Sequence, residues 1–110
     1  MSDKDNEVFQ PIIKEIKNLK PVKKEVYIKL NPFNFLPKCM NSFYRYFGSL
    51  TTPNCNDVVV WTVFSEILQV SEAQVDKFRS ISDPEGGKLT ENFRKLQPLN
   101  GRTVFKIGVD

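Results

Sequence analysis

The run from Val58 to Phe64 constrains the fold of this chain more than any other segment. It reads VVVWTVF, is the most hydrophobic stretch in the sequence, and follows the turn-forming pair Asn56 and Asp57. Short segments rich in β-branched and aromatic residues favour a pleated strand. Because apolar side chains occupy both alternating sets of positions, the run predicts a central strand that is covered on both faces.

Three other segments are predicted to be strands. Glu25 to Leu30 alternates apolar and polar residues, which is typical of a half-buried strand. Phe43 to Phe47 alternates as well, and Thr103 to Ile107 closes the chain as a strand. Between the first two segments, residues 31–37 contain two prolines and are predicted to be a loop, since proline is excluded from central strands.

An amphipathic helix is predicted from Glu7 to Leu19. Its apolar residues recur at helical spacing and form one stripe: Phe9, Ile12, Ile13, Ile16 and Leu19. Pro11 is tolerated only in a first turn, so the helix is expected to begin near Phe9 or Gln10. Pro21 is expected to end it.

A second helix is predicted from Ser71 to about Ser80. Ser71 and Gln74 have the spacing of a capping box, in which each side chain bonds a free backbone N–H at the helix start. Val75 and Phe78 are expected to face the core. Residues 84–87, which read PEGG, predict a flexible turn.

These elements predict a mixed α+β fold in which strands dominate. With 110 residues, the chain is one small domain or part of a larger one. Aromatic residues reach 12%, which favours a packed β-rich interior over disorder. No strand followed by a glycine-rich loop and a helix is present, so nothing indicates a nucleotide-binding fold.

The charge pattern favours neither nucleic acid nor a membrane as a partner. The formal net charge is only +3, and the one basic cluster is best interpreted as a solvated helix face: Lys14, Lys17, Lys20, Lys23 and Lys24. No run approaches the roughly 20 apolar residues of a membrane span. The polar first residues lack the apolar core of a signal peptide, so no secretion signal is expected in the chain as written.

Catalytic chemistry is restricted by the complete absence of histidine. A Ser-His-Asp or Cys-His centre is therefore excluded, and so is a histidine zinc site. Cys39 and Cys55 have neither zinc-ribbon nor redox spacing. Taken by themselves, the residues predict a β-rich piece without a catalytic centre or a metal ligand.

Several blocks nevertheless resemble, in order, the C-terminal portion of the α-class carbonic anhydrases. They are residues 9–13 (FQPII), 30–37 (LNPFNFLP), 43–53 (FYRYFGSLTTP), 61–64 (WTVF), 71–79 (SEAQVDKFR) and 92–102 (NFRKLQPLNGR). The resemblance extends from about residue 6 to 108. It implies an incomplete domain over residues 1–110, taken from a large, mainly antiparallel sheet with peripheral helices.

The resemblance also implies roles for six residues. The threonine at the position of Thr51 accepts a hydrogen bond from zinc-bound hydroxide, and the one at Thr52 lines the substrate site. The remaining positions match the apolar wall beside the metal: Leu50, Val59, Trp61 and Val63. On the residues alone, the alternatives are a plain turn at Thr51-Thr52-Pro53 and a plain core strand after it.

The chain departs from the family in what it lacks. The three zinc histidines, the proton-shuttle histidine and the glutamate partner of Thr51 all precede the matched region in the family. The chain alone is therefore expected to bind no zinc and to be inactive, whereas the intact family uses zinc to interconvert carbon dioxide and bicarbonate. The alternative is a non-catalytic interaction module, like the inactive relatives of the family, although these keep the whole domain.

Cys55 carries a further implication of the resemblance. In secreted members, a cysteine just after the Thr-Thr-Pro turn bonds to one near the N-terminus, and that partner is absent here. Cys55 is thus expected to be a displaced disulfide residue, compatible with a secreted or extracellular parent. The resemblance gives no reason to pair it with Cys39, and the alternative is a buried or free thiol.

Overall fold

The computed structural model describes residues 1–19, 25–83 and 85–108. Its contacts cluster in two compact units. The first, here called the helical unit, combines Met1–Leu36 with Leu68–Glu91, and the second, the sheet unit, combines Pro37–Ile67 with Asn92–Asp110. Each unit is therefore assembled from two separate stretches of the chain. The mixed α+β architecture agrees with the fold class predicted from the sequence.

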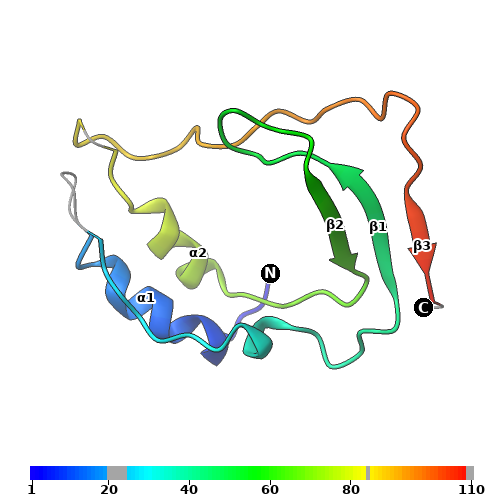
Figure 1. Ribbon diagram of the computed structural model, residues 1–110. Helices are drawn as coiled ribbons and strands as arrows, with labels where there is room; N and C mark the ends of the chain where they lie inside the picture. The colour runs from blue at the N-terminus through cyan, green and yellow to red at the C-terminus, as the bar shows by residue number, and fades with distance from the viewer. Residues whose placement is uncertain (20–24, 84, 109–110) are drawn as a thin grey trace. The chain divides into compact units, whose positions relative to one another are not determined.

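The sheet unit contains three antiparallel strands, β1 (Phe43–Gly48), β2 (Val59–Phe64) and β3 (Phe105–Ile107) (Figure 1). Their order is β2-β1-β3, so β1 is the central strand. β1 and β2 form a hairpin in which Tyr46 lies opposite Trp61. β3 returns from the end of the chain and pairs Ile107 with Phe43.

The predicted position of the Val58–Phe64 strand is wrong. β2 begins one residue later, at Val59, and lies at the edge of the described sheet, where it pairs with β1 alone. Its faces are not covered either, since Val60 is 53% and Val63 48% exposed. The run has the composition of a central strand, but the described residues supply a neighbour on only one side.

The first helix of the helical unit is shorter than its apolar stripe predicts. A 3₁₀ turn (η1, Glu7–Phe9) leads into α1 (Gln10–Ile16), which confirms the expected start with Pro11 in the first turn. α1 ends at Ile16 instead of Leu19, and the predicted stop at Pro21 lies outside the described residues. A second 3₁₀ turn, η2 (Pro32–Phe35), lies in the predicted loop.

The second helix, α2 (Glu72–Arg79), confirms the predicted capping box. Ser71 Oγ accepts a bond from the Gln74 N–H at 3.1 Å, and Gln74 Oε1 accepts one from the Ser71 N–H at 3.3 Å. The side-chain amide of Gln74 also forms two hydrogen bonds with the backbone of Asn6. Its Oε1 accepts from the Asn6 N–H, and its Nε2 donates to the Asn6 carbonyl, each at 2.8 Å. Gln74 is 2% exposed, whereas Val75 is half-buried and Phe78 is exposed. The buried centre of this helix face is thus polar, and the expectation that Phe78 faces a core is wrong.

Replacing Ser71 with Ala is expected to destabilise α2 by about 1 kcal/mol, because it removes an N-terminal cap. The loss of circular dichroism signal at 222 nm in water measures the change and requires no cooperative unfolding transition. Ser82→Ala, an exposed serine outside the helix, serves as the control and is expected to change little. Equal effects of the two substitutions would contradict the capping role.

The predicted strand from Glu25 to Leu30 is not formed. Its alternation is retained, because Val26 and Ile28 are half-buried while Tyr27 is 88% exposed. Residues 25–30 nevertheless have no regular structure and no ladder partner among the described residues. The alternating pattern gives the correct faces, but a strand also needs a neighbouring strand to satisfy its backbone.

Two further local features complete the helical unit. The expected turn is present at residues 85–87, where Asp83 Oδ1 accepts bonds from the N–H groups of Glu85 and Gly87; Pro84 lies outside the described residues.

On α2, hydrogen bonds from Arg79 to Glu72 and Asp76 raise the pKa of its guanidinium. These side chains are exposed, so the pairs contribute little to stability. None of the described helices has the length and apolar character needed to cross a membrane.

Candidate functional site

The loop between β1 and β2 carries the two threonines singled out from the sequence. Across the loop, the Leu50 N–H donates to the Asn56 carbonyl at 2.9 Å, and the Cys55 N–H donates to the Thr52 carbonyl at 2.7 Å. These backbone bonds give the loop a defined shape with both Thr51 and Thr52 exposed. The loop is thus held by its own backbone, which leaves the threonine side chains available.

Trp61 is fixed beside this loop by three neighbours. Its indole N–H donates to the Ser49 carbonyl at 3.1 Å, and its ring stacks on Tyr46 with centroids 6.3 Å apart. Gly48 lies next to it, where a Cβ would be only 2.9 Å from Trp61 Cδ1. Glycine at position 48 therefore allows the indole to lie flat against the end of β1.

A pocket of about 280 Å³ brings Thr51 and Trp61 together. Tyr46, Leu99 and Val104 contribute to its wall, which thereby joins the hairpin to the segment that precedes β3. Leu96 also lines the pocket and is fully exposed. The wall is mixed, because polar and charged residues line it together with these apolar side chains: Ser49, Thr51, Arg94, Lys95, Gln97 and Arg102.

The other four predicted site residues lie close in the fold. Val59 and Val63 share a face of β2 with Trp61, because alternate residues of a strand point the same way. Leu50 and Thr52 flank Thr51 on the loop and are exposed. All six residues therefore belong to one hairpin, and two of them line the same pocket.

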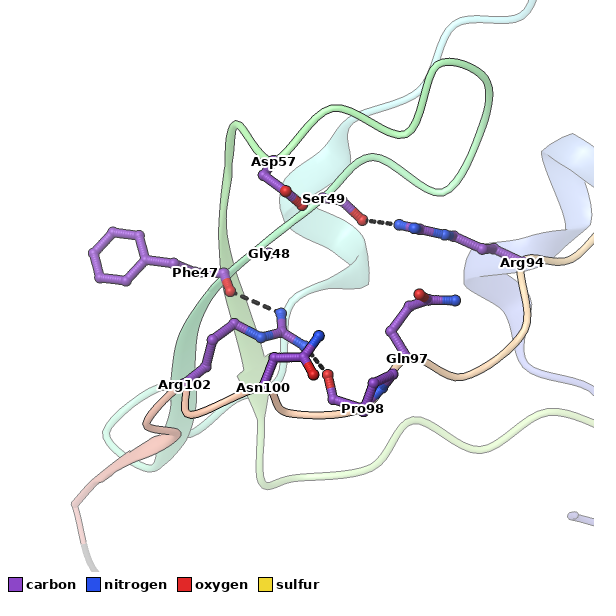
Figure 2. Close-up of a pocket in the computed structure, with 9 residues that line it drawn as sticks. All are labelled: Phe47, Gly48, Ser49, Asp57, Arg94, Gln97, Pro98, Asn100 and Arg102. Atoms are coloured by element: carbon purple, nitrogen blue, oxygen red, sulfur yellow. Dashed lines mark hydrogen bonds between the residues drawn. The ribbon is translucent and has the colours of Figure 1, made fainter.

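A second, more polar pocket of about 370 Å³ adjoins the first (Figure 2). Two arginines from the segment before β3 line it, together with Ser49 and Asp57 from the two ends of the loop. Arg102 donates to the carbonyls of Leu99, Phe47 and Pro98 at 2.9, 3.0 and 3.1 Å. It thereby joins this segment to the end of β1.

Arg94 reaches into the same pocket from the other side and donates to the Ser49 hydroxyl (Figure 2). The sequence reasoning did not single out either arginine. Both lie in residues 92–102, where no periodic pattern exists to mark them. The available signal was the basic character of this segment, which contains Arg94, Lys95 and Arg102 but no acidic residue.

The donor set of this chain does not fit zinc. The sequence contains no histidine, and the part of the chain that the structure describes has no group of three His, Cys, Asp or Glu side chains able to hold a metal ion. Structural zinc takes four such ligands and catalytic zinc takes three.

Cys39 is exposed and Cys55 is half-buried, and neither forms a disulfide. Both thiols are expected to be free in the purified monomer, and titration with a thiol reagent under denaturing, non-reducing conditions should find two per chain. A Cys39→Ser variant provides the matched control and should retain one. A homogeneous bond between Cys39 and Cys55, seen as a loss of two mass units, would contradict the assignment of Cys55 as a residue without its partner.

Comparison with known proteins matches this chain to one family. The family model described as eukaryotic-type carbonic anhydrase matches residues 1–108. Putative carbonic anhydrase 5 of Caenorhabditis elegans is 38% identical over 97 residues, covering 87% of this chain and 31% of that protein. Carbonic anhydrase 15 of Mus musculus is 38% identical over 111 residues, covering 93% of this chain and 34% of that protein. The chain thus spans about a third of the length of the curated relatives that it matches.

Proposed function

This chain belongs to the eukaryotic-type carbonic anhydrase family, and on that premise we propose that it is the C-terminal part of a carbon dioxide-hydrating domain. In this proposal, residues 1–110 supply the threonine loop and the apolar wall of the substrate site. The zinc ligands come from a preceding part of the parent protein. The chain alone is inactive, and its parent interconverts carbon dioxide and bicarbonate.

The observation that carries the proposal is the shared pocket of Thr51 and Trp61. Carbon dioxide is small and apolar, so a wall of aromatic and aliphatic side chains suits it and excludes water. Bicarbonate, in contrast, needs hydrogen-bonding groups at the edge of such a wall. The pocket offers both, since Thr51 lies in it beside the apolar side chains of Trp61 and Leu99, and two arginines also line it.

Each side chain then has a distinct task. The Thr51 hydroxyl donates one hydrogen bond and accepts others, which suits it to orienting an attacking oxygen. Thr52 contacts the bound substrate or product. Trp61, with Leu50, Val59 and Val63, forms the apolar wall.

The test of this proposal is to look for a longer protein in the source organism. Transcript sequencing and intact-mass measurement should find a product about three times as long, with an in-frame upstream strand of the form His-x-His. In that longer protein, Thr51→Ala should lower kcat/KM for carbon dioxide hydration about 100-fold, the usual effect of removing one preorganised hydrogen-bonding group. Thr90→Ala, an exposed threonine in the helical unit, is the matched control.

The alternative is a stand-alone interaction module without catalysis. Detection of only the 12.7 kDa product, without an upstream histidine-bearing exon, would contradict the enzyme-fragment proposal and favour this module. A longer protein in which Thr51→Ala has no effect would retain the family assignment but contradict the role given to the loop.

A further inference from the structure

We propose that the polar pocket next to β1 binds a small oxyanion, namely a carboxylate or phosphate group, through Arg94. This inference goes beyond the proposed function, because it concerns another kind of ligand in the more polar of two adjoining pockets, which share Ser49, Arg94, Gln97 and Arg102. It begins from the two guanidinium groups that line one pocket of about 370 Å³. A volume of this size falls at the lower end of the range for small-molecule sites.

The positive charge in this pocket is only partly offset, because two guanidinium groups share it with one carboxylate, that of Asp57. Neither Arg94 nor Arg102 pairs with a carboxylate within residues 1–19, 25–83 and 85–108, where the ion pairs found are those of Arg79. Asp57 lines the same pocket but forms no ion pair there. Two guanidinium groups in one half-enclosed space therefore retain an unmatched charge, which attracts an anion.

The two arginines have different tasks. The three guanidinium nitrogens of Arg102 donate hydrogen bonds to three backbone carbonyls. Arg102 therefore holds the pocket wall together, and its charge acts on a ligand only at a distance. Within the part of the chain that the structure describes, Arg94 forms one hydrogen bond, to the Ser49 hydroxyl, which holds its side chain across the pocket (Figure 2). Most of the planar donor fork of Arg94 remains free, and this fork matches the two oxygens of a carboxylate or phosphate.

The remaining lining residues favour a polar ligand. Gln97 and Asn100 line the pocket with side-chain amides, and Figure 2 draws the Gln97 amide between the two arginines. Phe47 contributes its backbone, while its ring points away from the pocket. Amide groups can donate to a third oxygen or accept from a hydroxyl on the ligand.

Trp61 provides a built-in reporter of binding. It is the single tryptophan of the chain, and its indole N–H donates to the carbonyl of Ser49, the residue whose hydroxyl holds Arg94. The experiment titrates the full chain with sodium acetate, and separately with sodium phosphate, at constant ionic strength maintained with chloride. Tryptophan fluorescence and the NMR signals of the Trp61 indole N–H and the Arg94 Nε–H are recorded.

At least one of the two anions is expected to bind saturably and to shift the signals of both residues. Arg94→Gln should weaken binding about tenfold or more, because it removes charge-assisted hydrogen bonds. Lys77→Gln on α2 removes the same charge from the helical unit and should leave the affinity unchanged. Asp57→Asn should tighten binding, since it removes the one carboxylate in the pocket, and a gain of affinity cannot result from misfolding.

Three outcomes would overturn the proposal. The first is the absence of saturable binding of either anion to the wild-type chain. The second is equal weakening by Arg94→Gln and Lys77→Gln, which would show only an effect of overall charge. The third is an unchanged affinity in Asp57→Asn. A preference for acetate or for phosphate distinguishes the two sources of the oxyanion and leaves the site itself supported.

Discussion

Purified as it stands, the chain is expected to contain no stoichiometric zinc and to hydrate carbon dioxide no faster than the buffer does. The reason is the donor set: there is no histidine in the sequence and no suitable cluster of ligands among the described residues. A zinc hydrase owes its rate to a metal that lowers the pKa of bound water to about 7, and such an enzyme reaches about 10⁶ turnovers per second. Compared with a complete zinc hydrase, the isolated chain is therefore expected to lose the whole of the catalysed rate.

Metal content by mass spectrometry and stopped-flow pH indicator assays measure the two expectations separately. A complete carbonic anhydrase with its three histidines, carried through the same purification, is the positive control for zinc retention and for rate. One zinc per chain together with a rate above the buffer would contradict the prediction. It would also mean that ligands other than histidine assemble a working site here.

The second large effect expected is the absence of a sharp cooperative melt in the isolated chain, with strong binding of a hydrophobic dye. Ile16 and Pro37 are the only buried apolar side chains among the described residues. Large apolar side chains such as Phe33, Phe93 and Ile67 are mostly exposed. A surface of this kind leaves little hydrophobic stabilisation and offers apolar patches and open strand edges to other molecules.

Helical signal is nevertheless expected to persist, because the cap of α2 at Ser71 is local. Differential scanning calorimetry, far-UV circular dichroism and a dye titration, each with size-exclusion chromatography to establish the monomer, measure these properties. Lysozyme, a compact protein of similar size, serves as the reference for a cooperative melt. A sharp transition in a monomer that binds no dye would mean that the chain is a domain in its own right, and the interaction-module alternative would then lead.

Local signals predicted the structure well. The capping box of Ser71 and Gln74, the start of α1 at Gln10 and the strand that became β1 were all evident in the sequence, because each depends on neighbours a few residues away. Mixed α+β architecture and family followed from ordered motifs. What these signals cannot show is which distant segment a strand or helix packs against.

The wrong strand predictions have a common cause. The 25–30 segment and β2 both have the pattern of paired strands, but among the described residues the first has no neighbouring strand and the second has only β1. In the site, sequence motifs identified Thr51 and Trp61, which do line one pocket. They missed Arg94 and Arg102, since long side chains in an irregular segment leave no periodic trace.

The interleaving of the two units has a consequence for how the chain folds during synthesis. Asn6 is bound by Gln74, 68 positions later, and Phe43 in β1 pairs with Ile107 in β3. At a translation rate of about 5–20 residues per second, the N-terminal segment waits for several seconds before its partner leaves the ribosome. Contacts of such long sequence separation also slow folding. The apolar stripe of α1 is therefore exposed to chaperones throughout that interval, and no truncation before α2 leaves either unit complete.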